Sequence, residues 1–168
     1  MTAPIIALVV AVAENRVIGK GGKLPWRIPD DMKWFKERTL GKPCIMGRKT
    51  WESLPKRPLP ARTNIVVTRD RSYRTEGAVV VHTLDDAIAV AAREEPAEIM
   101  IIGGADISRA ALAKAGRIYL TSVHGVVEGD TYFPEIDRGD WAETIIGVYP
   151  PSPERPIGYS FIILDRHS

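Results

Sequence analysis

Short apolar runs alternate with longer amphipathic stretches along the chain, and this alternation is the main indication of its fold. Runs rich in β-branched residues predict strands, and stretches with apolar positions three and four apart predict helices. The predicted strands are Ile5–Ala13, Cys44–Met46, Asn64–Thr68, Ala78–Val81, Glu98–Ile102, Arg117–Val123, Thr144–Val148 and Tyr159–Asp165. The predicted helices are Asp30–Thr39, Lys49–Leu54, Leu84–Arg93 and Ile107–Ala115.

This order of elements predicts an α/β fold with three layers. Strands that alternate with helices form βαβ units, so a mostly parallel eight-stranded sheet with helices on both faces is expected. No helix separates the last two strands, which predicts an antiparallel edge at the C-terminal end. Pro150, Pro151, Pro153 and Pro156 stiffen the connection between them. Nothing marks a domain boundary, so residues 1–168 are expected to form a single domain.

Charge and composition restrict the possible partners. A net charge of +2 with scattered basic residues argues against a nucleic-acid-binding protein. The apolar run Ile5–Ala13 is too short to span a bilayer and lacks a preceding basic stretch, so no membrane association is expected. The single cysteine, Cys44, suits the reducing cytoplasm and is expected to be a small buried hydrophobic residue. The histidines lack metal-ligand spacing, so no metal is expected.

One carboxylate lies on the apolar face of the first predicted helix. At about 100° per residue, Met32, Trp34 and Phe35 share one face, and Asp31 falls between Trp34 and Phe35. A buried carboxylate is unfavourable unless it accepts hydrogen bonds. No cation close to Asp31 on the same face is an obvious partner, and Arg38, near the far end of the helix, is the only local candidate. The pattern therefore predicts that a ligand with paired N–H donors binds Asp31.

Two strand-to-helix junctions carry glycines. Met46–Thr50 combines Gly47 with basic residues at a helix start, which predicts an anion site; a solvated basic turn is the alternative. Ile99–Ala105 contains Gly103 and Gly104 but not the Rossmann fingerprint, and it could be only a tight turn. Two such junctions in one small domain favour a dinucleotide as the bound ligand.

Arginines and a glycine-rich stretch extend this interpretation. Arg69, at the end of a strand, suits a 2′-phosphate, although a solvated arginine is equally consistent with the pattern. Arg57 and Arg62 lie in a proline-stiffened segment where an arginine could be held rigidly for a carboxylate, and a solvated arginine is the alternative for each. The segment Asn15–Leu24 could be a lid over a site or a flexible connector.

Taken together, these motifs resemble the dihydrofolate reductase family, in order and spacing along the whole chain. The matching blocks are Arg16–Gly19, Leu24–Trp26, Asp31 in its helix, Met46–Leu54, Pro58–Pro60, Arg62–Asn64, Ile101–Gly104 and Gly129–Pro134. The resemblance implies reduction of 7,8-dihydrofolate to tetrahydrofolate with NADPH, by hydride transfer to pterin C6 and protonation of N5. It also implies a cytoplasmic monomer in one-carbon metabolism, with antifolate-type inhibitors as plausible ligands.

The resemblance also implies roles for individual residues. Asp31 binds the pterin ring, Thr121 assists through water, and Leu24 and Trp26 cover the reacting centre. The expected substrate-binding residues are Val10, Met32, Phe35, Leu54, Leu59, Ile102, Arg57 and Arg62. The expected cofactor-binding residues are Ala11, Ile18, Gly47, Arg48, Lys49, Thr50, Thr68, Arg69, Gly104, Ala105, Asp106, Ile107 and Thr131. The chain departs from the family pattern at Ala105, which replaces a glycine, and at Ser108, where a tyrosine is frequent.

Two other functions remain open at this stage. A riboflavin-pathway reductase of the same fold has no need for an acid facing a pterin or an arginine for a glutamate carboxylate, so Asp31 and Arg62 argue against it. A non-catalytic folate- or nucleotide-binding module needs a cleft but no lid, so the glycine-rich segment before Trp26 argues against that alternative.

Overall fold

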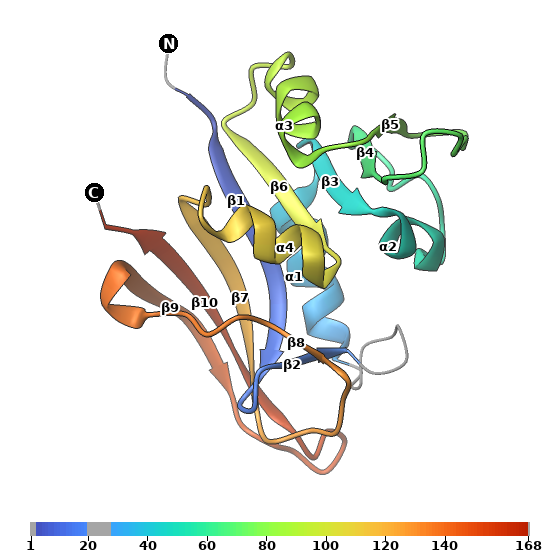
Figure 1. Cartoon of the computed structure of the whole chain (residues 1–168). Coiled ribbons are helices and arrows are strands. Elements are labelled where there is room, and N and C mark those ends of the chain that lie inside the picture. The colour runs from blue at the N-terminus through green and yellow to red at the C-terminus, as the bar shows by residue number, and fades with distance from the viewer. Residues whose placement is uncertain (1–2, 20–27, 168) are drawn as a thin grey trace.

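The structure is a computed structural model that describes residues 3–19 and 28–167. Its larger sheet has eight strands in the order β5-β4-β3-β6-β1-β7-β10-β9 (Figure 1). In that order they span Val79–Val81, Asn64–Val67, Cys44–Gly47, Glu98–Gly103, Ile5–Ala13, Arg117–His124, Gly158–Arg166 and Trp141–Tyr149. Neighbours from β5 to β7 are parallel, and β10 is antiparallel to both β7 and β9. The predicted mostly parallel sheet with an antiparallel edge is confirmed.

Helices cover both faces of this sheet, as the sequence predicted. The helices are α1 (Pro29–Thr39), α2 (Arg48–Ser53), α3 (Leu84–Ala92) and α4 (Ala105–Leu112). Helices α3 and α4 pack in one hydrophobic cluster, and α1 and α2 pack in a second. In Figure 1, α4 lies in front of the sheet and α1 behind it. The last helix begins and ends earlier than the predicted Ile107–Ala115.

Local signals explain where the helices begin. Pro29 occupies the first position of α1, where its fixed φ suits a helix and its missing N–H is not needed. Thr83 caps α3, because its Oγ1 accepts a hydrogen bond from Asp86 N at 3.0 Å. Helix α1 packs on the sheet through Trp34, whose ring stacks on Phe161 with centroids 4.5 Å apart.

A second, two-stranded sheet was not predicted. It pairs β2 (Val17–Gly19) with β8 (Thr131–Tyr132), and a 3-10 turn follows at Arg138–Asp140. Strands this short show no detectable alternation of hydrophobic and polar residues. Gly129 allows the two segments to approach, because a Cβ there would lie 2.7 Å from the carbonyl oxygen of Gly19.

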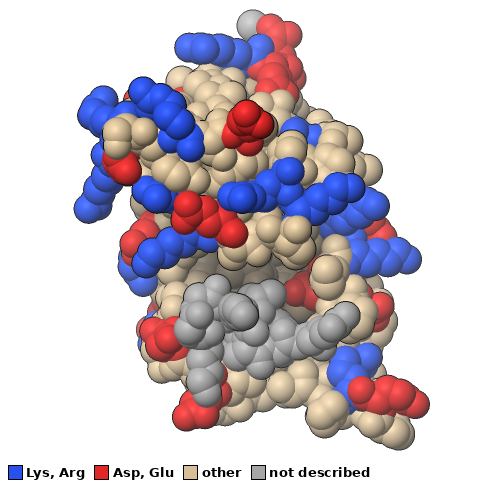
Figure 2. All heavy atoms as spheres, turned by 90° about the vertical axis from the view of Figure 1, so that its right-hand side faces the viewer, with Lys and Arg blue, Asp and Glu red and all other residues tan. Residues whose placement is uncertain are grey.

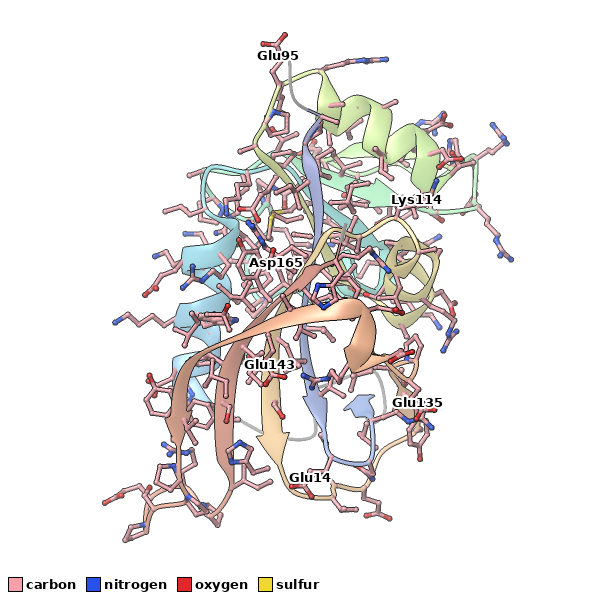
Figure 3. All side chains as sticks on the ribbon, turned by 90° about the vertical axis from the view of Figure 1, so that its left-hand side faces the viewer. Glu14, Glu95, Lys114, Glu135, Glu143 and Asp165 are labelled. Carbon is pink, nitrogen blue, oxygen red and sulfur yellow. The ribbon has the colours of Figure 1, made fainter. Side chains whose placement is uncertain are left out.

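A network of charged groups closes the amino ends of the central strands. Glu98 is nearly buried and accepts hydrogen bonds from Lys42 at 2.7 Å, Tyr119 at 2.6 Å and Arg117 at 3.2 Å. Arg117 also donates to Asp165, which is labelled on β10 in Figure 3, at 2.6 Å. Burial favours the neutral form of Glu98, but the Lys42 and Tyr119 bonds outweigh it and lower the pKa of Glu98.

Cys44 is fully buried in β3, as the sequence predicted for a small hydrophobic residue. Burial raises the pKa of its thiol to about 12, with Arg62 and Lys42 opposing this increase. Such a thiol stays protonated and unreactive at neutral pH. Within the described residues, no helix is both long and apolar enough to cross a membrane, and no group of three potential metal ligands gathers.

Candidate active site

The central feature of the site is a direct hydrogen bond between α1 and β7. Thr121 Oγ1, which is 1% exposed, donates to Asp31 Oδ1 at 2.5 Å. Burial raises the pKa of the Asp31 carboxyl, and the Thr121 bond opposes this increase. Among the described residues, Thr121 is the only side chain recorded as donating to Asp31. A carboxylate has two oxygens that accept hydrogen bonds, and Thr121 contacts one of them, Oδ1.

The structure places the two side chains of α1 and β7 that the sequence linked with Asp31, Arg38 and Thr121. Arg38, the cation that the sequence offered as a local candidate partner, stacks on Trp34 instead: its guanidinium lies 4.2 Å from the Trp34 ring centroid. The stacking holds it on the sheet side of α1, one turn beyond Trp34. Thr121 contacts Asp31 directly, and the water-mediated role toward the pterin that the resemblance implied for Thr121 stays a prediction.

Met32 is not part of the packed face of α1, contrary to the predicted apolar face. It is 65% exposed, whereas Trp34 is 4% exposed. The two residues are about 200° apart on the helix, so they cannot both point toward the sheet. Asp31, Trp34 and Arg38 share the packed side instead. Phe35 is half-buried beside them.

Val10 also lies on a different side from the one predicted. It packs with the cluster under α3 and α4, while Val9 packs with the cluster under α1. Successive residues of a strand point to opposite faces, so Val9, which the sequence reasoning missed, faces the same side as Thr121. The other predicted apolar residues, Leu54, Leu59 and Ile102, all pack in the α1 cluster.

Arg62 is held in a defined orientation at one end of α1. Its Nε donates to Pro60 O at 2.8 Å and its Nη1 donates to Thr39 Oγ1 at 2.9 Å. Asn64, which sequence reasoning did not single out, fastens the same turn through two hydrogen bonds with the Leu59 backbone. Arg57 is exposed, and its guanidinium lies 5.5 Å from the Trp51 ring centroid. Arg62 is therefore the better oriented of the two arginines.

The two glycine junctions lie side by side. Strands β3 and β6 are paired, and a Cβ on Gly47 would lie 3.6 Å from Gly104 N. Gly103 has φ +132°, which disfavours any L side chain. Thr50 Oγ1 lies 3.4 Å from the Cβ position of both Gly103 and Gly104. The N-terminal residues of α4, Ala105, Asp106 and Ile107, follow directly, and Ser108 is buried behind them.

Basic and polar side chains surround these junctions on the face shown in Figure 2, which carries α2 and the ends of β4 and β5. Arg48 and Thr68 are half-buried, and Lys49 and Arg69 are exposed. The carboxyl ends of β3 and β4 are adjacent, since Gly47 pairs with Val67. A nucleotide with phosphates fits this surface, because glycine backbone, helix N–H groups and cations meet there.

The remaining expected residues lie at the other end of the site or outside the described residues. Ala11 pairs with Thr121 across β1 and β7, and Thr131 pairs with Gly19 in the small sheet. Ile18 packs against the α3–α4 cluster. Leu24 and Trp26, the predicted cover of the site, lie outside the described residues, as does the second half, residues 20–24, of the predicted lid.

Fold and site together define an α/β protein that binds a nucleotide cofactor, with the partly buried carboxylate of Asp31 on the neighbouring helix α1. The sequence model of the family described as "Dihydrofolate reductase" matches residues 5–166. The chain therefore belongs to the dihydrofolate reductase family.

Known relatives agree with this assignment. A dihydrofolate reductase of Neisseria gonorrhoeae is 51% identical over 138 residues, which cover 82% of this chain and 84% of the relative. The type 3 dihydrofolate reductase of Salmonella typhimurium is 41% identical over 162 residues, covering 96% and 98%. A solved dihydrofolate reductase from Enterococcus faecalis, complexed with NADP(H) and RAB-propyl, superposes with a TM-score of 0.87. It is 34% identical and covers 98% of this chain and 97% of its own.

Proposed function

We propose that this chain is an enzyme that reduces 7,8-dihydrofolate to 5,6,7,8-tetrahydrofolate with NADPH and so supplies one-carbon metabolism. The observation that carries the proposal is the pairing of Asp31 with Thr121 in a partly buried position. A carboxylate held there suits the paired N–H donors of a pterin ring. Membership of the family and the likeness to an NADP(H)-bound relative support the same assignment.

The cofactor site follows from the two adjacent glycine junctions. Gly47, Gly104 and the N-terminal residues of α4 bring backbone N–H groups to one place, where a pyrophosphate fits. The 2′-phosphate of the adenosine ribose and the cofactor atoms around it are held by basic and hydroxyl side chains, namely Arg48, Lys49, Thr50, Thr68 and Arg69. Ala11, Ile18 and Thr131 lie toward the nicotinamide end. When bound, NADPH supplies the hydride for the reduction.

Asp31 orients the substrate and favours its protonated form. The buried carboxylate accepts from the pterin and stabilises positive charge that develops on the ring. Phe35, Leu54 and Ile102 exclude water around the ring, and Met32 covers the open side of α1. Leu24 and Trp26, for which the resemblance implies cover of the reacting centre, lie outside the described residues.

Arg62 binds the glutamate end of the substrate. Its guanidinium is preorganised by Pro60 and Thr39, so a carboxylate can pair with its remaining N–H groups with little loss of side-chain entropy. Leu59 contacts the aminobenzoyl ring, and Arg57 assists at the edge of the pocket. We propose that the protein works as a cytoplasmic monomer and that antifolate-type inhibitors compete for the Asp31 pocket.

The test is the oxidation of NADPH by purified protein, followed by loss of the reduced-nicotinamide absorbance, with and without dihydrofolate. Dihydrofolate-dependent oxidation with formation of tetrahydrofolate is the expected result. Binding of dihydrofolate without turnover indicates a non-catalytic module instead. Reduction of a pyrimidine ribose-phosphate, with no reaction on dihydrofolate, indicates the riboflavin-pathway activity.

A further inference from the structure

Two carboxylates hold the guanidinium of Arg48. Its Nη1 donates to Asp70 Oδ2 at 3.2 Å, and its Nε donates to Glu52 Oε2 at 3.4 Å. The guanidinium also lies 4.1 Å from the ring centroid of Tyr73, whose hydroxyl donates to the same Glu52 oxygen at 3.2 Å. Arg48 is therefore already engaged through two of its nitrogens.

Asp70 is fixed in the orientation that this contact requires. Its Oδ1 accepts from Ser72 N at 2.9 Å and from Ser72 Oγ at 2.6 Å, so the other oxygen, Oδ2, is left for Arg48. These two Ser72 bonds lower the pKa of the Asp70 carboxyl most; desolvation opposes them, and Arg48 lowers the pKa further. The carboxylate is thus negatively charged at neutral pH.

Asp70 lies at the same edge of the sheet as the proposed cofactor site. Arg48 directly follows β3, and Asp70 comes three residues after the end of the neighbouring strand β4. Figure 2 shows acidic side chains interspersed among the lysines and arginines of this face. A phosphate that approaches Arg48 therefore also approaches a negative charge.

A phosphate and a carboxylate compete for the same donors of an arginine. Both accept from the planar N–H groups of the guanidinium, and a bound dianion is repelled by a neighbouring carboxylate. Arg48 and Asp70 are each about half exposed, with side chains 40% and 46% accessible, so solvent screens the effect and keeps it modest. NADH lacks the 2′-phosphate and does not experience this competition.

We propose that Asp70 is a specificity-determining residue: its carboxylate occupies Arg48 and thereby reduces the preference of this chain for NADPH over NADH. This inference rests on the proposed function, which places Arg48 at the 2′-phosphate. Lys49 and Arg69 make no recorded ion pair within the described residues, so they attract the phosphate without such competition. Asp70 acts on cofactor choice only and has no role at the pterin.

The test variant is Asp70→Asn, which keeps the shape of the side chain and its bonds to Ser72 but removes the charge. Calorimetric titration with adenosine 2′-monophosphate is expected to show binding about three- to tenfold tighter than in the unaltered protein. Binding of adenosine 5′-monophosphate stays unchanged within about twofold. In turnover, the KM for NADPH falls by a similar factor and the KM for NADH does not.

Two further variants isolate the contact. Asp85→Asn is the matched control. It removes the charge of an exposed aspartate on α3, whose Oδ1 lies 3.2 Å from Lys114 Nζ, and it is expected to leave the affinities for both nucleotides unchanged. In an Arg48→Ala background, Asp70→Asn is expected to lose most of its effect, because the shared guanidinium is gone.

Several outcomes overturn the proposal. Weaker binding of adenosine 2′-monophosphate to Asp70→Asn means that Asp70 orients Arg48 for the phosphate instead of competing with it. Equal changes for both nucleotides mean that the substitution only alters the loop. The nucleotide titration does not need catalysis, so it tests the role of Asp70 even in a protein that does not oxidise NADPH with dihydrofolate. A lack of that oxidation would contradict the proposed function and not the role of Asp70.

Discussion

The hydroxyl of Tyr159 donates a hydrogen bond to Oδ2 of Asp30, so neighbouring carboxylates on α1 are held by different strands. Asp30 is attached to β10 through Tyr159, and Asp31 is attached to β7 through Thr121. Burial and the contact with Asp30 raise the pKa of Tyr159 to about 12, so its hydroxyl remains a donor at neutral pH. The first turn of α1, and with it Asp31, is therefore fixed relative to the sheet.

Asp31→Asn is expected to keep the fold and NADPH binding but to lower kcat/KM at neutral pH by about a hundredfold to ten-thousandfold. The amide cannot accept from two N–H donors as a carboxylate does, nor hold a proton. Burial raises the pKa of Asp31 in the folded protein, so ionising this carboxyl lowers the free energy of unfolding. The loss develops as the pH rises from the pKa of Asp31 in the unfolded chain through its pKa in the folded protein. The variant should thus unfold at an equal or higher temperature. Unchanged turnover contradicts the role of Asp31.

Thr121→Val removes the hydroxyl but nearly preserves the volume of the side chain. The Thr121 bond opposes the rise in the pKa of Asp31, so its loss should raise that pKa further. The ionisation of Asp31 in the pH profile of kcat/KM is expected to move to higher pH. Thr121→Ser keeps the donor and should retain the original profile. A profile that is the same in all three proteins excludes this coupling.

Arg62→Lys tests the proposed contact with the glutamate end. Lysine keeps the charge but lacks the planar pair of N–H groups, and it cannot make both contacts of Arg62 with Pro60 and Thr39. The KM for dihydrofolate should rise about tenfold or more, with kcat little changed. Dihydropteroate, which has no glutamate, serves as the control substrate, and its KM should not respond. An equal effect on both substrates argues for a disturbed fold.

Tyr119→Phe tests the network at the opposite end of the strands. It deletes a hydrogen bond to the buried Glu98 carboxylate, which should lower the free energy of unfolding by about 1–3 kcal/mol near neutral pH. Urea denaturation measures this difference. Tyr132→Phe, at an exposed tyrosine, is the control and should change stability little.

The same network predicts how stability depends on pH. Hydrogen bonds hold the pKa of Glu98 in the folded protein below its usual value, so the ionised carboxylate stabilises the fold. This contribution to the free energy of unfolding is present above the pKa of Glu98 in the unfolded chain. It is lost as the pH falls through the pKa of Glu98 in the folded protein. Glu98→Gln should therefore destabilise the protein most near neutral pH, and the difference from the unaltered chain should shrink in acid. A constant difference across this range contradicts the assignment.

Much of the fold could be predicted because the signals are local. Apolar runs gave the eight strands of the main sheet, and helical periodicity gave four helices on both faces. Thr83 and Pro29 determined helix starts through contacts within a single turn. The strands β2 and β8 escaped prediction because each is too short to show a period, and they pair with each other across more than 110 residues of chain.

The sequence by itself determined that a carboxylate, two glycine junctions and several arginines follow one another in the order typical of the dihydrofolate reductase family. Only the tertiary structure decided which atoms meet. Thr121 and Asp31 are 90 residues apart, and Arg48 and Asp70 are 22 apart, so no local period relates them. Likewise, Val9 lies on the Asp31 side and Val10 does not, because strand register decides which face a side chain occupies.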